Sequence, residues 1–186
     1  MKNKKAGVIW SLLISAFAVT SLAATDAVDV KLKFSFKNAE LSEMIERYAK
    51  VSGRKVIVDP AVRGRATIML SGEVSQSEAF EALSDALAIN GYSYVEKGDT
   101  IVVQTARTIQ RGLNPVSTEL PSLKPERMAT WVYRPLTVTA DELNKQLHHL
   151  VSKDGEMTAA NGKLLFTDFT STLHRIEKVL KEVDRK

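Results

Sequence analysis

The segment with the clearest structural signal reads VIVDPAVRG and covers residues 56–64. It opens on three β-branched residues, a short apolar run that is typical of a buried strand. Pro60 ends this run, because proline fixes its own φ angle and restricts the residue before it to extended backbone. Gly64 marks a second bend before another apolar run at residues 66–70. The pattern predicts two strands joined by a tight, proline-containing turn.

The residues before this stretch predict a strand and a helix. Apolar and polar residues alternate from residue 28 to 37, and this period of two indicates a strand with one buried face. A helical apolar stripe follows, with Asn38 as its expected cap and Gly53 at its expected end.

The residues after this stretch complete a first module. Ser75 and Glu78 form a capping box, which predicts that a helix begins there. Two β-branched or aromatic segments, residues 92–96 and 101–104, are expected to form a hairpin. The predicted order over residues 28–105 is β-α-β-β-α-β-β, an α+β arrangement.

Residues 106–127 are predicted to be a linker. Three of the five prolines of the chain lie in this segment, and its apolar residues follow no period. Proline favours an extended, semi-rigid spacer, so we expect two small domains joined by such a segment.

A second module with the order β-α-β-β-α is expected over residues 128–186. Thr139 and Glu142 repeat the capping box, and Asn161-Gly162 is a favoured two-residue hairpin turn. Asp168 is the expected cap of a last amphipathic helix. Both modules are therefore α+β.

The first 23 residues are predicted to be a signal peptide. Three lysines precede an apolar run over residues 6–19, and Ser21-Leu22-Ala23 places small residues where a signal peptidase reads, so cleavage is expected after Ala23. An uncleaved membrane anchor is the alternative for this run. Cleavage implies a periplasmic chain, and we expect no membrane insertion of the mature part.

Charge and cysteine content exclude several classes of function. The formal net charge of +4 falls to +1 when the three lysines of the leader leave, so the basic character is no argument for nucleic-acid binding. There is no cysteine, which excludes disulfides, thiolate nucleophiles and cysteine metal sites.

The remaining chemistry-bearing residues indicate neither an enzyme nor a metal or cofactor site. His148 and His149 are adjacent on a predicted helix and point about 100° apart, while His174 has no partner at helical spacing. No serine lies in a Gly-x-Ser-x-Gly elbow, and no glycine-rich loop precedes a lysine. We therefore expect no catalytic residue, no metal and no cofactor.

One segment is a candidate partner-binding surface. Val30, Lys31, Leu32 and Lys33 lie in the first predicted strand, with the lysines on its solvent-exposed face. Such an edge can receive a strand from a partner. The alternative is that the lysines protect an exposed edge against unwanted pairing.

The chain resembles the N-terminal periplasmic domains of bacterial secretins. The first of these domains is matched by the segments Phe34–Leu41, Val58–Thr67 and Asn90–Tyr92. The second, which has a KH-like fold in that family, is matched more weakly by Tyr133–Leu136, Ala140–Leu143, Lys163–Asp168 and Val183–Asp184. The first domain is also similar to the N-terminal signalling domain of TonB-dependent transducers.

The resemblance implies a non-enzymatic periplasmic interaction module in type II secretion or type IV pilus assembly. In secretins the first domain meets inner-membrane components or substrates, and the second packs side by side in a ring. The sequence ends at Lys186, without the further domains and C-terminal barrel of a secretin, so we expect partnership with a barrel chain associated with the outer membrane. The alternative is a signalling domain that contacts an anti-sigma regulator.

Overall fold

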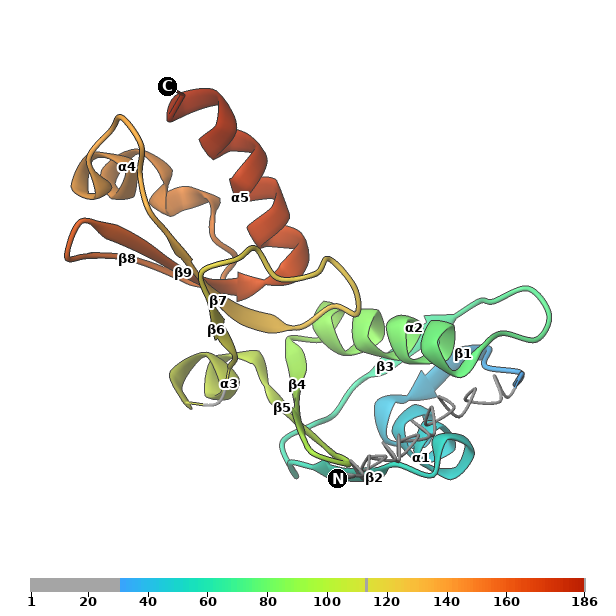
Figure 1. Ribbon diagram of the computed structural model, residues 1–186. Helices are drawn as coiled ribbons and strands as arrows, with labels where there is room; N and C mark the ends of the chain where they lie inside the picture. The colour runs from blue at the N-terminus through green and yellow to red at the C-terminus, as the bar shows by residue number, and fades with distance from the viewer. Residues whose placement is uncertain (1–30, 113, 186) are drawn as a thin grey trace, which may run out of the picture.

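The computed structural model describes residues 31–112 and 114–185, which form two α+β modules in succession (Figure 1). The predicted signal peptide, its cleavage site at Ala23 and the candidate residue Val30 lie outside these ranges. The elements of the first module are β1 (Phe36–Glu40), α1 (Leu41–Ser52), β2 (Lys55–Val58), β3 (Arg65–Ile68), α2 (Gln76–Ile89), β4 (Tyr92–Lys97) and β5 (Thr100–Thr105).

The first module has two small sheets that pack against its helices. β1 and β3 pair antiparallel, and a three-stranded sheet has the order β2-β5-β4 with β2 parallel to β5. Four aromatic rings run through the core, with successive centroids 6.5, 5.1 and 4.7 Å apart. They belong to Phe34, Tyr48, Phe80 and Tyr94, so α1 and α2 share one core with the sheet.

The predicted turn after β2 is closed by a residue from β4. Asp59 Oδ1 accepts the backbone N–H of Ala61 at 2.8 Å, which tightens the turn. The Tyr92 hydroxyl accepts the N–H of Arg63 and donates to the carbonyl of Ala61, both at 3.0 Å. Hydrogen bonds therefore join the turn segment, residues 56–64, to the segment Asn90–Tyr92.

Gly64 explains why the turn motif ends on a glycine. Its φ is +123°, a conformation that residues with a side chain rarely adopt. A Cβ atom at this position would lie 2.6 Å from Asn90 Oδ1. The backbone therefore approaches the end of α2 where only glycine fits.

The second module is a four-stranded sheet with helices. Its elements are β7 (Met128–Tyr133), α4 (Ala140–Leu147), the 3-10 helix η1 (His148–Leu150), β8 (Glu156–Ala160), β9 (Lys163–Phe169) and α5 (Thr170–Val183). β6 (Val116–Ser117) completes the sheet in the order β6-β7-β9-β8. Apolar side chains of α4 and α5 share a core with those of β7 and β9. The α+β fold class and the order of elements in both modules are as predicted.

Two local predictions are confirmed by hydrogen bonds and backbone angles. Both capping boxes are present, from Ser75 to Glu78 at α2 and from Thr139 to Glu142 at α4. The turn between β8 and β9 has positive φ at Asn161 and at Gly162 (50° and 70°), as a two-residue hairpin turn requires.

The expected strand over residues 28–37 is corrected. Leu32 forms only an isolated bridge with Val74, and β1 begins at Phe36. The alternation predicted burial correctly, because Leu32 and Phe34 are buried between exposed neighbours. Asn38 lies inside β1 with φ 48° and its N–H donates to Thr67 Oγ1, so it does not cap α1.

The expected extended linker is also corrected, because residues 106–112 form helix α3 (Ala106–Gly112). Ala106 and Ile109, three residues apart, are fully buried against Met128 and Phe169 of the second module. Packing against the second module therefore stabilises helix α3. A segment of seven residues without a regular apolar period does not predict a helix by itself.

Asp168 is not the cap of α5. Its buried carboxylate accepts the N–H and the hydroxyl of Ser152 at 2.6 Å each and the N–H of Phe169 at 2.7 Å. Burial raises the pKa of Asp168, although these donors act in the opposite direction. The residue therefore fastens the loop before β8 instead of opening a helix.

Candidate interaction surface

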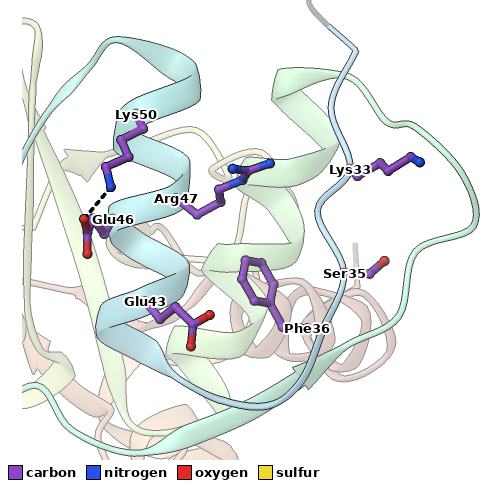
Figure 2. A pocket seen from close by; sticks show the side chains of 7 residues that line it. All are labelled: Lys33, Ser35, Phe36, Glu43, Glu46, Arg47 and Lys50. Carbon is purple, nitrogen blue, oxygen red and sulfur yellow. Dashed lines mark ion pairs between the residues drawn. The ribbon is translucent and has the colours of Figure 1, made fainter.

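A groove of about 420 Å³ lies between α1 and the chain segment that leads into β1 (Figure 2). It is lined by Lys33, Ser35, Phe36, Glu43, Glu46, Arg47 and Lys50. The helix and the segment are held together beneath it by the buried side chains of Phe34 and Tyr48, whose rings meet edge to face. The groove is thus a surface feature of a well-packed module.

Charged side chains line this groove around one aromatic ring. Glu46 and Lys50 form an ion pair at 2.6 Å. The hydrogen bond from Lys50 and its positive charge lower the pKa of Glu46. Lys33 and Arg47 are exposed and form no ion pair with any described residue. Figure 2 shows Arg47 reaching from α1 into the gap, beside the half-buried Phe36. Glu43, which also lines the groove, is exposed and forms no ion pair with a described residue. The groove therefore presents two unpaired cations and one unpaired carboxylate next to apolar surface.

The structure separates the candidate partner-binding residues. Leu32 is only 6% exposed, and its N–H and C=O both bond to Val74, at 2.8 and 2.9 Å. In an antiparallel bridge of this kind, the backbone groups of the neighbouring residues face the opposite side. The side chains of Lys31 and Lys33 are exposed and can contact a partner. The side chain of Leu32 is buried and cannot.

The junction between the modules is an ordered contact. Ala106, Ile109, Met128 and Phe169 form its buried apolar centre. The Met128 N–H donates to Ser93 Oγ of β4 at 2.8 Å. Next to it, Lys124 and Asp85 form an ion pair. Apolar packing and directional bonds together fix how one module is placed on the other.

Glu126 joins the two modules and was not singled out by the sequence. It is 7% exposed, and its N–H donates to Ser84 Oγ of α2 at 3.1 Å. Its carboxylate accepts the hydroxyl and the backbone N–H of Ser171, at 2.6 and 3.4 Å, in the first turn of α5. Because a carboxylate is favourable at a helix N-terminus, Glu126 supplies the cap that Phe169, the N-cap residue, cannot.

Replacing Glu126 by alanine is expected to lower the free energy of unfolding by about 2–3 kcal/mol, because α5 loses its cap and buried donors lose their acceptor. Urea denaturation followed by circular dichroism measures this change. Glu119→Ala is the matched control, since Glu119 is exposed in the same segment. Equal effects of the two substitutions would contradict the capping role.

The histidines form no metal site among the described residues, where no group of three or more potential ligands comes together. His148 Nδ1 lies 3.0 Å from the carbonyl of Lys145 in the preceding helix α4. His174 Nε2 lies 2.8 Å from the carbonyl of Pro121 and holds that segment to α5. Across residues 31–112 and 114–185, no helix combines the length and the apolar character needed to cross a membrane.

Comparison with known proteins finds a match for the first module. Residues 34–103 match the family model described as GspD-like, N0 domain. The chain is 24% identical over 154 residues to secretin XcpQ of Pseudomonas aeruginosa, covering 82% of this chain and 23% of that protein. It is 24% identical over 190 residues to secretin ExeD of Aeromonas hydrophila, covering all of this chain and 27% of that protein.

A solved structure shares the fold across both modules. The Klebsiella pneumoniae type II secretion outer membrane complex of PulD, PulS and the PulC HR domain contains a chain that aligns with a TM-score of 0.71. The alignment has 21% identity and covers 82% of this chain and 27% of that one. The sequence described here spans about a quarter of the length of the curated relatives it matches.

Proposed function

Because residues 34–103 match the GspD-like N0 domain family model, and the whole chain resembles the N-terminal domains of secretins, we propose that this protein is a non-enzymatic interaction module of type II secretion. The observation that carries the proposal is the N0 domain with an exposed groove on its first helix. The module acts in the periplasm, next to an outer-membrane secretin assembly. Relatives of this kind favour type II secretion over pilus assembly, and do not favour the signalling alternative.

The partner is an inner-membrane component of the secretion machine that binds along the groove. Lys33 and Arg47 offer two cations, and Phe36 offers apolar surface in the same groove. A partner segment that carries an acidic residue beside an apolar one complements this arrangement, because opposite charges steer association and the apolar contact slows dissociation. The PulC HR domain in the Klebsiella complex supports the presence of such a partner class.

Each of the two proposed modules, residues 28–105 and 128–186, has its own binding role. The first binds the inner-membrane partner, while the second packs beside neighbouring copies in a ring or against a barrel-bearing secretin chain. The buried junction around Ile109 and Met128 transmits the position of one module to the other. This fixed geometry suits a component that spans a gap between two assemblies.

Affinity purification from the envelope tests the proposal. A tagged chain is expected to enrich type II secretion components, identified by mass spectrometry. The double variant Lys33→Glu, Arg47→Glu is expected to lose at least about ten-fold of the inner-membrane partner, because two attractive contacts become repulsive. Lys97→Glu, Lys178→Glu is the matched control, since it makes the same charge change at exposed positions outside the groove.

Two results would contradict the proposal. One is that the folded wild-type chain enriches no secretion component. The other is that the groove variant and its control enrich the same partner equally, which would exclude the groove as the binding surface.

A further inference from the structure

β2 is an edge strand with two neighbouring apolar side chains in solvent. It lies at the end of the sheet β2-β5-β4, where no described residue pairs with its other edge. Ile57 is 59% exposed and Val58 is 37% exposed. Figure 1 shows β2 at the margin of the first module, away from the second. An apolar edge strand is a template for pairing with another strand.

The register with β5 determines which backbone groups face the open edge. Asp59 donates its backbone N–H to a carbonyl of β5 at 2.9 Å. In a parallel pair, alternate residues bond to the same neighbour, so Lys55 and Ile57 also direct their backbone groups toward β5. Val56 and Val58 therefore present their N–H and C=O groups at the open edge.

We propose that this edge pairs antiparallel with β2 of a second copy of the chain, with Ile57 on the two-fold axis. Val56 then lies opposite the partner's Val58, and each such pair exchanges two hydrogen bonds, because both residues direct their backbone groups to the edge. Ile57 faces the partner's Ile57 as a non-hydrogen-bonded pair, in which side chains are closest.

The charges of the strand select this register and this occupant. Lys55 and Asp59 flank Ile57 on the same face, two residues away on either side. Antiparallel pairing about Ile57 places Lys55 opposite the partner's Asp59 on both sides of the axis. In-register parallel pairing would instead place lysine beside lysine and aspartate beside aspartate, which is unfavourable. The edge is therefore complementary to itself.

The contact is short, and this sets its strength. About five residues from each copy take part, much less than the roughly 20–30 residues a side of a stable interface. The pairing is consequently weak and reversible in solution. A two-fold contact also joins two copies and then stops, unlike the head-to-tail contacts that close a ring. The β2 pairing uses no residue of the groove on α1 and does not depend on the proposed function.

A cysteine scan tests the register, because the natural chain contains no cysteine. Ile57→Cys places two sulfur atoms across a pair whose Cα atoms are about 4.5 Å apart, within disulfide reach. Mild oxidation of the purified chain at a few hundred micromolar is expected to yield mostly cross-linked dimer. Val58→Cys is the matched control: the two copies of this residue are diagonal, about 7–8 Å apart, so we expect at least ten-fold less dimer.

A charge reversal supplies the second arm of the test. Adding Lys55→Glu to Ile57→Cys places like charges opposite each other at two points and is expected to reduce cross-linking about ten-fold. Equal cross-linking from positions 57 and 58 would overturn the proposal. So would a folded Ile57→Cys chain that stays monomeric, because another segment of the chain covers the edge, or one that cross-links only to another protein in an envelope extract.

Discussion

Replacing Asp184 by alanine is expected to destabilise the second module by about 3–5 kcal/mol, because a buried acceptor of several hydrogen bonds is removed. Asp184 is 2% exposed at the end of α5. Its carboxylate accepts the Tyr133 hydroxyl and the N–H groups of Leu136, Thr137 and Val138, at distances from 2.7 to 3.1 Å. Tyr133 ends β7, and the other three residues belong to the loop before α4, so one side chain fixes this loop to the last helix.

The same contacts make the stability of this module depend on pH. Burial alone would raise the pKa of Asp184, but the backbone N–H groups and the Tyr133 hydroxyl outweigh it and hold the pKa well below its usual range. A carboxylate with a depressed folded-state pKa contributes stability above its unfolded pKa of about 3.9. That contribution is lost as the pH falls below about 4, toward the folded-state pKa.

Tyr133 makes the stability of the second module fall at alkaline pH. Burial and the hydrogen bond to Asp184 raise the pKa of Tyr133 to about 12. Its contribution is therefore complete below the unfolded pKa of about 10 and is lost as the pH rises toward 12.

Urea denaturation at several pH values, followed by the fluorescence of Trp131, checks these expectations, because Trp131 lies in the core of the second module. Glu182→Ala is the matched control, since Glu182 is exposed two residues before Asp184. The loss caused by Asp184→Ala should be largest near neutral pH and should shrink below pH 4. A loss no greater than that of the control would show that the carboxylate does not hold the loop.

Replacing Gly64 by alanine is expected to cost the first module about 3 kcal/mol or more, because two penalties add. An alanine at φ +123° is strained by about 1–3 kcal/mol. The new Cβ would also lie 2.6 Å from Asn90 Oδ1, so the Asn90 side chain must move away from the position in which its amide donates to the carbonyl of Ala86. Such overpacking typically costs about 1–3 kcal/mol.

Circular dichroism during thermal unfolding measures this effect. Gly112→Ala is the matched control, because a Cβ there meets no atom of the described residues within 4 Å and the residue ends helix α3 without a positive φ. We expect the control to be neutral or slightly stabilising. Similar melting temperatures for the two variants would show that the turn tolerates a side chain.

Local signals made most of the secondary structure predictable. The capping boxes at Ser75 and Thr139 and the turn at Asn161 each depend on residues within a few positions of one another, and all three are confirmed. The burial pattern around Leu32 and Phe34 was likewise readable, although the strand there was not. A pattern of apolar residues reports burial more directly than it reports pairing.

Contacts between distant residues account for what the sequence did not reveal. Glu126 caps a helix that begins 44 residues later, and nothing near it in the sequence indicates this role. Helix α3 is ordered by Met128 and Phe169, which belong to another module. The groove likewise lies between a chain segment and a helix face that only the folded chain brings together. The sequence therefore indicated Lys33 as a candidate but not Arg47.

Photo-cross-linking from position 47 in living cells shows whether the groove binds an inner-membrane partner. Arg47 is exposed in the groove and is replaced by a photoreactive amino acid, with Lys97, exposed at the end of β4, as the control position. We expect irradiation to link position 47, and not position 97, to an inner-membrane protein of the type II secretion system. Adducts that are absent from position 47, or equal from both positions, would contradict it.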